Sequence, residues 1–327
     1  MSIQIDVHGE SHVGRHRPDN EDQFLIADLN KSMRVHQTSL GLSHQTRLFG
    51  GSQGKLLLVA DGLGGHESGE RASTLAVDGV ANYILNTMDW FFRVNEKNEV
   101  EFESELKDAF RHSQSILDAE SEAIPQRRGM ATTLTLAYID WPKLYVVHVG
   151  DTRCYHIRGE AINCRTTDHT IAELTKSTIG GSEKDSKSLD EGDTKPHNPM
   201  GHALWNVIGG SDRSLDPQIT KSELVLGDSL LLCSDGLTRY VPDKELLSLV
   251  SQDVPSKEIC DQLIAMANER GGRDNITSVL AKFNENQLDD AEAAAVTATI
   301  PCETPTASPV AGIANETESA PANHLAN

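Results

Sequence analysis

The chain contains 327 residues, of which 38% are hydrophobic, so it is long enough for one large or two ordinary domains with a sizeable core. Its formal net charge of −20 at pH 7 argues against a broad basic face that binds nucleic acid or an anionic membrane surface. No apolar run approaches the ~20 residues of a membrane span, and the N-terminus lacks the features of a signal peptide. The five cysteines form no close-spaced pairs, so we expect no disulfide framework and a cytoplasmic protein.

The first half of the chain predicts strands, an insertion and two helices. Residues 3–7 and 22–28 have the pattern of strands. Residues 30–54 are polar and contain several glycines, so we expect an irregular insertion there. Apolar residues then recur at helical spacing over 72–84 and over 102–117, which predicts two helices that each bury one face against the core.

The second half returns to strands and then to helices. The predicted elements are a hairpin over 132–149, a strand over 153–158, helices over 243–250 and 256–270, and a strand over 276–283. Residues 166–216 are polar and indicate a mobile surface excursion outside the core. Groups of strands separated by a helix pair favour an α+β fold with antiparallel sheets over a regular βαβ alternation.

Two apolar runs of the chain both end in an Asp-Gly pair. Residues 56–60 lead into Asp61, and residues 230–234 lead into Asp235. Such runs are typical of strands buried on both faces, so each aspartate stands at the end of a rigid element. Asp274 lies just before the last predicted strand. Three carboxylates that converge on one cleft are what a hard divalent cation needs, so the pattern favours a metal site.

A simpler interpretation is that each Asp-Gly pair forms a hairpin turn. This interpretation is disfavoured at Asp61, because a glycine-rich loop over 63–70 leads from it into a predicted helix. It is also weakened at Asp235, where residues 237–250 indicate a loop and a helix.

Five stretches of the chain carry a resemblance to a known family. They are Arg17-Pro18-Asp19-Asn20-Glu21-Asp22, Val59-Ala60-Asp61-Gly62-Leu63-Gly64-Gly65-His66, Gly129-Met130-Ala131-Thr132-Thr133, Val149-Gly150-Asp151-Thr152-Arg153, and Cys233-Ser234-Asp235-Gly236-Leu237 with Arg273-Asp274-Asn275-Ile276-Thr277. In this order, over roughly residues 3–283, the chain resembles bacterial-type members of the metal-dependent protein serine/threonine phosphatases of type 2C. One such motif is weak support, whereas five in order, in matching strand and loop context, are strong.

The resemblance implies a four-layer αββα sandwich, in which helix pairs flank two central antiparallel sheets. It implies a catalytic domain over 1–284 with a variable flap over about 168–216. Residues 285–327 contain seven acidic residues and no Lys or Arg, and they are rich in Ala, Thr and Pro. We therefore predict a disordered acidic tail after the domain.

The resemblance also implies an activity, which is the hydrolysis of phosphoserine and phosphothreonine in proteins that a serine/threonine kinase phosphorylates. Two Mn²⁺ or Mg²⁺ ions would activate a bridging water, without a covalent intermediate. Arg17 would bind the phosphate bidentately, and Asp61 would bridge the two ions. The remaining ligands would be Asp235 and Asp274 at the first ion, and the Gly62 carbonyl oxygen and Glu21 at the second, with Asp22 acting through water.

The role of Asp151 and the source of the leaving group's proton each have two possible explanations. In similar bacterial enzymes a weaker third ion is held at the positions of Asp151 and Asp235. Asp151 is equally well explained as an acid that caps a turn and pairs with Arg153, and the two roles can coexist. Leu63 stands where some family members carry the His that is thought to protonate the leaving group, so that proton needs another source, a metal-bound water or His66.

Two other functions compete with this one. The first is a pseudophosphatase, which keeps the fold as a binding module. The intact acids and Arg17 argue against it, because a module without catalysis has no physical need for a costly cluster of like charges. The second is a metal-dependent phosphohydrolase that acts on small phosphomonoesters, and the broad insertion after Asp168 fits a protein-sized substrate slightly better.

Overall fold

The computed structural model describes residues 3–34, 47–64, 67–88, 98–179, 203–210 and 214–285. All of them belong to the first of the two units into which the chain divides, Met1–Asn286 and Gln287–Asn327. The predicted tail lies outside the described residues apart from Glu285, so it stays a prediction. No helix in these ranges has both the length and the apolar character that crossing a membrane requires.

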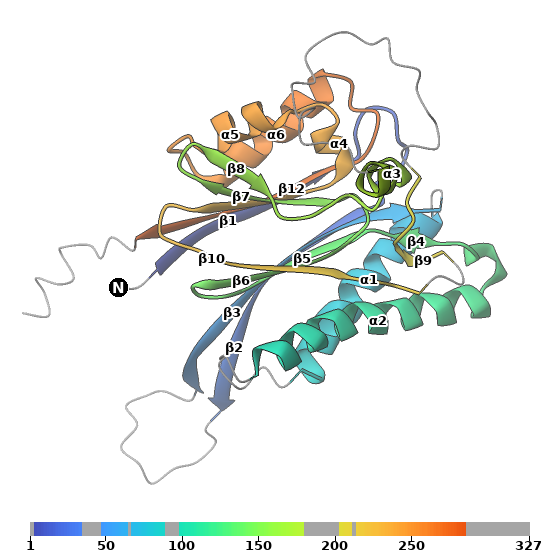
Figure 1. Ribbon diagram of the computed structural model, residues 1–327, viewed down its shortest axis with the longest axis horizontal. Helices are drawn as coiled ribbons and strands as arrows, with labels where there is room; N and C mark the ends of the chain where they lie inside the picture. The colour runs from blue at the N-terminus through green and yellow to red at the C-terminus, as the bar shows by residue number, and fades with distance from the viewer. Residues whose placement is uncertain are drawn as a thin grey trace, which may run out of the picture. The chain divides into compact units, whose positions relative to one another are not determined.

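Two antiparallel sheets pack face to face at the centre of the fold (Figure 1). The first sheet has the strand order β1 (Ile3–His12), β12 (Ile276–Glu285), β11 (Ser229–Cys233), β7 (Arg153–Arg158) and β8 (Ala161–Cys164). The second has the order β10 (Gln218–Glu223), β6 (Lys143–Val149), β5 (Leu134–Asp140) and β3 (Arg47–Leu63), with β2 (Asp22–Arg34) also paired to β3. The short strands β4 (Ala131–Thr132) and β9 (Ile208–Gly209) extend the second sheet from the end of β3.

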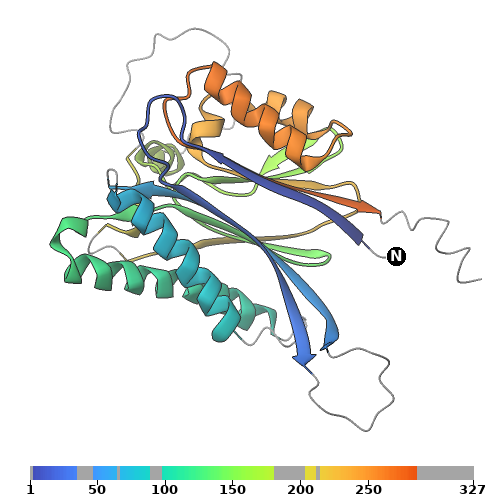
Figure 2. The same cartoon turned by 180° about the vertical axis from the view of Figure 1, so that it is seen from behind.

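Helices cover the outer face of each sheet (Figures 1 and 2). The outer face of the second sheet is covered by α1 (Glu67–Asn86) and α2 (Glu99–Ala123). The outer face of the first is covered by α4 (Asp235–Thr238), α5 (Asp243–Val250) and α6 (Ser256–Glu269). A further helix, α3 (Ile171–Ile179), lies in the segment predicted as the flap. The arrangement confirms the predicted four-layer αββα sandwich.

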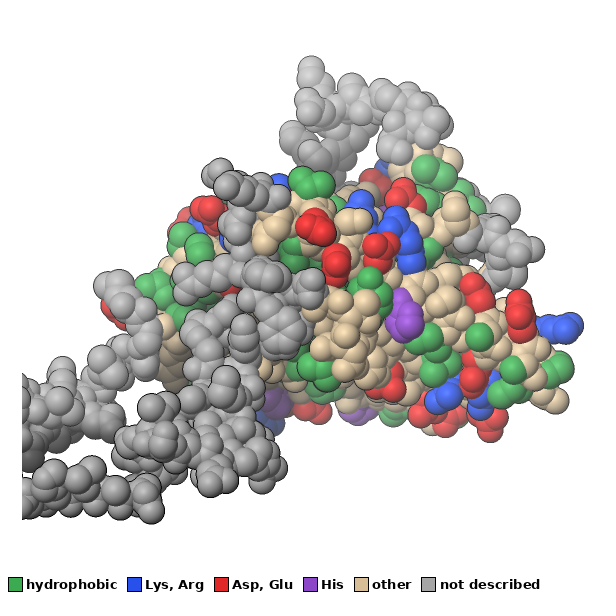
Figure 3. All heavy atoms as spheres, turned by 90° about the horizontal axis from the view of Figure 1, so that it is seen from below, with side chains coloured by type: hydrophobic (Ala, Val, Ile, Leu, Met, Phe, Trp, Pro, Cys, Tyr) green, Lys and Arg blue, Asp and Glu red, His purple; other side chains and the backbone are tan. Residues whose placement is uncertain are grey.

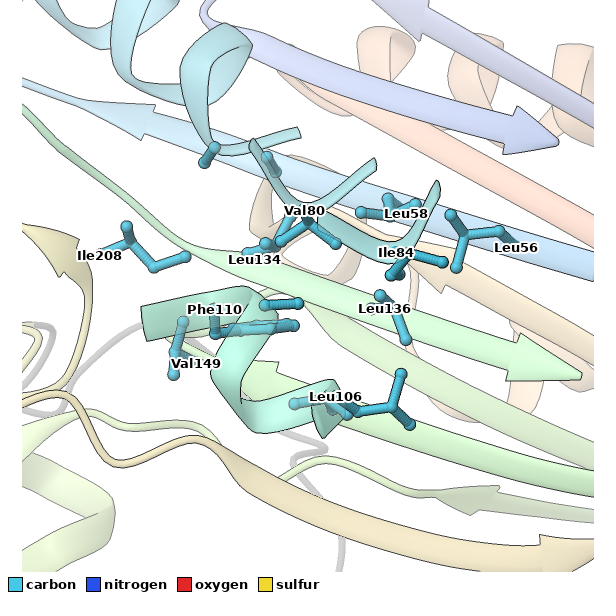
Figure 4. Packing of buried hydrophobic residues seen from close by; sticks show 14 of the residues in the cluster. Leu56, Leu58, Val80, Ile84, Leu106, Phe110, Leu134, Leu136, Val149 and Ile208 are labelled. Atoms are coloured by element: carbon cyan, nitrogen blue, oxygen red, sulfur yellow. The ribbon is translucent and has the colours of Figure 1, made fainter. Parts of the chain in front are cut away.

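Consecutive residues of β3 belong to two different hydrophobic clusters, which is why its sequence is apolar without interruption. Leu56 and Leu58 pack in the cluster beneath α1 and α2 (Figure 4). Leu57 and Val59 pack in the cluster between the two sheets. The same alternation occurs in β11, so both predicted strands are buried on both faces and hold the residue that follows them rigidly.

The irregular insertion predicted over 30–54 is wrong at both of its ends. β2 continues to Arg34 and β3 begins at Arg47, with one register shift between Asn30 and Ser32. Antiparallel strands are joined by backbone hydrogen bonds that nearly any residue can supply, so a polar hairpin extends without an apolar signal in the sequence. Residues 35–46 lie outside the described residues.

The surface excursion predicted over 166–216 also contributes to the core. Ile208 is fully buried in the cluster beneath α1 and α2, and Asn206 is 3% exposed. β9 reaches this position because it pairs with β4 at the end of β3. A two-residue strand has no periodicity that a sequence pattern can detect. Residues 180–202, a part of the predicted excursion, lie outside the described residues.

Acidic and basic side chains are interspersed on the face of the protein shown in Figure 3. On α2, Arg111 Nη1 lies 2.6 Å from Asp108 Oδ1, one helical turn away, and both side chains are about half exposed. Exposed pairs of this kind contribute at most ~1 kcal/mol to stability.

Candidate metal centre

Predicted acids from both sheets lie where the strands end. Asp22 begins β2 and is the register partner of Asp61, near the end of β3. Asp235 begins α4, separated from the end of β11 by one residue, and Asp274 lies just before β12. Because each acid belongs to a buried strand or stands at its end, packing of the two sheets brings the four carboxylates into one cluster.

Asp22 connects the two sheets within this cluster. Its Oδ2 accepts hydrogen bonds from Ser234 Oγ and Thr277 Oγ1, both at 2.7 Å. Ser234 follows β11 and Thr277 lies in β12, and both strands belong to the first sheet. Asp22 is only 3% exposed. Its Oδ1 is buried and has no hydrogen-bond partner, so this oxygen faces a position where a cation or water is needed.

Asp61 is held by its backbone. Its amide N–H donates to Thr133 Oγ1 at 3.1 Å, and its carbonyl oxygen accepts from Thr133 N at 2.9 Å and from Thr132 Oγ1 at 2.8 Å. The Gly129–Thr133 motif therefore positions Asp61 and leaves the carboxylate free for another task. This role was not predicted from the sequence, because it depends on the pairing of β3 with β4.

Glu21 and Gly62 pack against the start of α1. Gly62 N donates to Glu21 O at 3.2 Å. A Cβ on Gly62 would lie 2.2 Å from the carbonyl oxygen of Gly69, so only glycine permits this approach of β3 to the helix. A Cβ on Gly69 would lie 2.5 Å from Glu21 Oε2, which places the Glu21 carboxylate directly over the helix start.

The loop that carries Arg17 is tied to the Asp274 segment by a residue that the sequence analysis gave no role. Asn275 Nδ2 donates to the carbonyl oxygens of Val13 and Asp19, each at 2.9 Å. Asn275 Oδ1 accepts from Glu21 N at 2.9 Å. One amide side chain thus fixes the loop between β1 and β2, which holds Arg17 beside the acids.

Two arginines contact the cluster. Arg17 binds Asp274 bidentately, with Nε 2.9 Å from Oδ1 and Nη2 3.1 Å from Oδ2. Arg239 Nη2 donates to Asp235 Oδ2, and its Nη1 lies 3.3 Å from Asp274 Oδ2. The sequence analysis missed Arg239. The spacing could have revealed it, because Arg239 follows Asp235 by four residues and so lies on the same face of a helical turn.

Burial makes the acids of the cluster resist ionisation. It raises the pKa of Asp22 to about 7, although the hydrogen bonds from Thr277 and Ser234 oppose the shift. Burial, together with the charge of Asp22, raises the pKa of Asp61 well above its ordinary value. The pKa of Asp235 is raised by burial, against the charge of Arg239. Ionising these groups is costly, and a bound cation would offset that cost.

The donor set fits a hard divalent ion. The buried carboxylate oxygens Asp22 Oδ1 and Asp235 Oδ1 have no hydrogen-bond partner. Carboxylate and carbonyl oxygens, without sulfur, are the ligands that Mg²⁺ and Mn²⁺ prefer.

The family model of protein phosphatase 2C matches residues 42–281. The chain belongs to the protein phosphatase 2C family. Protein phosphatase PhpP of Streptococcus pneumoniae is 32% identical over 247 residues, which cover 72% of this chain and 88% of PhpP. The membership confirms the predicted resemblance and identifies the chain as an enzyme of the protein phosphatase class.

Solved structures of family members share the fold. The serine/threonine phosphatase PstP of Mycobacterium tuberculosis has a TM-score of 0.64 at 28% identity, over 86% of this chain and 99% of that one. The catalytic domain of PstP in complex with two manganese ions has a TM-score of 0.63 at 27% identity, over 87% of this chain and 100% of that one.

The structure does not show the predicted ion pair between Asp151 and Arg153. Arg153 forms a bidentate ion pair with Asp168, at 2.9 and 2.7 Å, instead of the predicted pair with Asp151. His169 is buried, lies between the rings of His148 and Trp205, and donates its backbone N–H to Gly150 O at 2.7 Å. It is therefore a structural residue that anchors the flap to the Asp151 turn. His66 lies outside the described residues.

Gly236 permits a close approach that holds Asp235 in place, which gives a first prediction. A Cβ on Gly236 would lie 1.9 Å from the carbonyl oxygen of Asn275. We expect Gly236→Ala to lower the free energy of unfolding by about 3 kcal/mol, because two backbone segments must separate. Urea denaturation of the variant measures this loss.

Gly159→Ala is the matched control. Its φ is +58°, but an added Cβ meets no atom within 4 Å, so the variant carries only the backbone strain of ~1 kcal/mol. Equal stability losses in the two variants would contradict the expected contact at Gly236.

Proposed function

We propose that this protein hydrolyses phosphoserine and phosphothreonine esters in proteins at a centre of two divalent ions. The observation that carries the proposal is the buried acid cluster, with unpartnered oxygens on Asp22 and Asp235, beside the guanidinium of Arg17. Family membership supports the reaction class, and the relatives PhpP and PstP are named as protein phosphatases.

The proposed ions are Mn²⁺ or Mg²⁺, because the donors are hard oxygens and because PstP is known in complex with two manganese ions. Bound divalent ions lower the pKa of coordinated water and so supply a nucleophile at neutral pH. The proposed ligands are those that the family resemblance implies, namely Asp61, Asp235, Asp274, Glu21 and the Gly62 carbonyl oxygen, with Asp22 acting through water.

We propose that Arg17 binds the phosphoryl group of the substrate. It already forms two parallel contacts with a carboxylate, that of Asp274, and the planar fork of a guanidinium suits a phosphate in the same way. Its side chain is 45% exposed, so it can turn toward a group that enters from solvent. The loop fixed by Asn275 keeps it within reach of the acids.

The substrates under this proposal are phosphoproteins, produced by a serine/threonine kinase in the cytoplasm. The kinase follows from the family resemblance, and the cytoplasmic location follows from the cysteine pattern of the sequence.

The test is phosphate release from a phosphothreonine peptide, with Mn²⁺, without metal, and with a chelator. We expect release that depends on Mn²⁺ and a higher kcat/KM for the peptide than for a small aryl phosphate. Metal binding without release from either substrate would favour a pseudophosphatase. A clear preference for the small ester would favour the small-molecule phosphohydrolase.

A further inference from the structure

A histidine and two acids face one another on the outer side of the first sheet. His8 and Glu10 are alternate residues of β1, so their side chains point to the same face of the sheet. Asp261 lies on α6, which packs against β1 and β12 on that face. One ligand atom of each of the three side chains lies within 4.8 Å of those of the other two. Folding thus gathers three metal-binding groups from segments that are far apart in sequence.

The separation of His8 and Glu10 fits a shared ion better than a hydrogen bond. His8 Nε2 lies 3.5 Å from Glu10 Oε2, and this nitrogen is buried and has no hydrogen-bond partner among the described residues. A charge-assisted hydrogen bond would bring the two atoms to ~2.8 Å. Two ligands of one tetrahedral Zn²⁺ ion, each about 2.1 Å from the metal, lie about 3.4 Å apart. An ion between the two atoms therefore requires little movement of either side chain.

Ser278 is a second polar group on this face whose hydrogen-bonding capacity is not used. It is the register partner of Glu10 in β12, so the two side chains share the face beneath α6. Ser278 has no exposed surface, and within the described part of the chain its Oγ has no hydrogen-bond partner. Buried polar atoms without partners are rare in folded proteins. Ser278 Oγ and His8 Nε2 together indicate that a polar ligand completes this place.

The neighbouring Cys260 does not supply a thiolate. Its Sγ donates a weak hydrogen bond to the carbonyl oxygen of His8 at 3.6 Å. Burial raises the pKa of this thiol to about 11, although the nearby Ser278 hydroxyl opposes the shift. The donor set is therefore one imidazole nitrogen and two carboxylate oxygens.

This donor set and its position separate the place from the acid cluster. Imidazole with carboxylates suits Zn²⁺, whereas a set of oxygens alone suits Mg²⁺ and Mn²⁺. Thr277 donates to Asp22 of the acid cluster, and Ser278 is the next residue of β12. Because successive side chains of a strand point to opposite faces, the two places lie on opposite sides of the first sheet.

We propose that His8, Glu10 and Asp261 bind a divalent transition-metal ion of the Zn²⁺ type, which links β1 to α6. Three protein ligands leave the fourth tetrahedral position to water. Lys257 Nζ lies 2.9 Å from Asp261 Oδ2, but its side chain is 62% exposed, so it can turn into solvent when the ion binds. The site is independent of the proposed phosphatase activity.

The test is the number of Zn²⁺ ions bound per full chain, measured by equilibrium dialysis and metal analysis at a free Zn²⁺ concentration that just saturates the wild type. We expect His8→Gln and Asp261→Asn each to bind one ion fewer than the wild type, because each variant removes a ligand. Any Zn²⁺ at the acid cluster is common to all the proteins and cancels in the difference. Zn²⁺ should also raise the melting temperature of the wild type more than that of either variant.

Glu269→Gln is the matched control, because Glu269 is an exposed acid about two turns further along α6. Equal Zn²⁺ counts in the wild type and in both variants would overturn the proposal. A loss in only one of the two variants, or an equal loss in Glu269→Gln, would also overturn the three-residue site. The Asp261 side chain is 49% exposed on a helix surface, so Asp261→Asn decides the test by itself if His8→Gln does not fold.

Discussion

Asp61→Asn should reduce Mn²⁺-dependent phosphate release from a phosphothreonine peptide by about 10³-fold, the size of effect seen when one preorganised electrostatic group is removed. Asp61 is the one carboxylate proposed to contact both ions, and a neutral amide cannot neutralise their charge. We also expect fewer bound Mn²⁺ ions per chain. Initial rates at saturating Mn²⁺, with ion counts by equilibrium dialysis, measure both effects.

The substitution leaves the backbone contacts of Asp61 with Thr132 and Thr133 in place, so the variant should fold. Asp28→Asn is the matched control, because Asp28 lies in the neighbouring strand β2 but is 63% exposed and pairs with Lys55. A variant at position 61 with the wild-type rate and the wild-type ion count would contradict the proposed bridging role.

The metal-free protein should lose stability as the pH rises from 4 to 7. Burial raises the pKa of Asp22 from its ordinary value of 3.8 to about 7. A carboxyl group whose pKa is higher in the folded state binds its proton more tightly there, so its contribution is complete below the ordinary pKa. The contribution is lost as the pH rises through the folded-state value. For Asp22 the loss is on the order of 4 kcal/mol.

Thermal melting of chelator-treated protein between pH 4 and 8 measures this dependence. With saturating Mn²⁺ the slope should reverse, because ions bind the ionised carboxylates and protons compete with them. Asp22→Asn should reduce the metal-free slope, since the amide does not titrate. A metal-free protein whose melting temperature is constant or rises over this range would contradict the buried, protonated state of the cluster.

The sequence by itself determined the fold class and the position of the proposed acids at strand ends. The apolar runs before Asp61 and Asp235 are visible locally, because a strand buried on both faces has no polar position until it ends. Helices α1 and α2 are predictable for a similar reason, since each buries one face at helical spacing. The motif order then placed the chain in its family.

Only the tertiary structure decided how these acids are held and which charges they meet. Asn275 ties the Arg17 loop to β12 through contacts with Val13 and Asp19, more than 250 positions away in sequence. Arg239 meets Asp274 because α4 and the turn before β12 pack side by side. Such contacts leave no periodic trace in the chain, because they arise between segments that folding brings together.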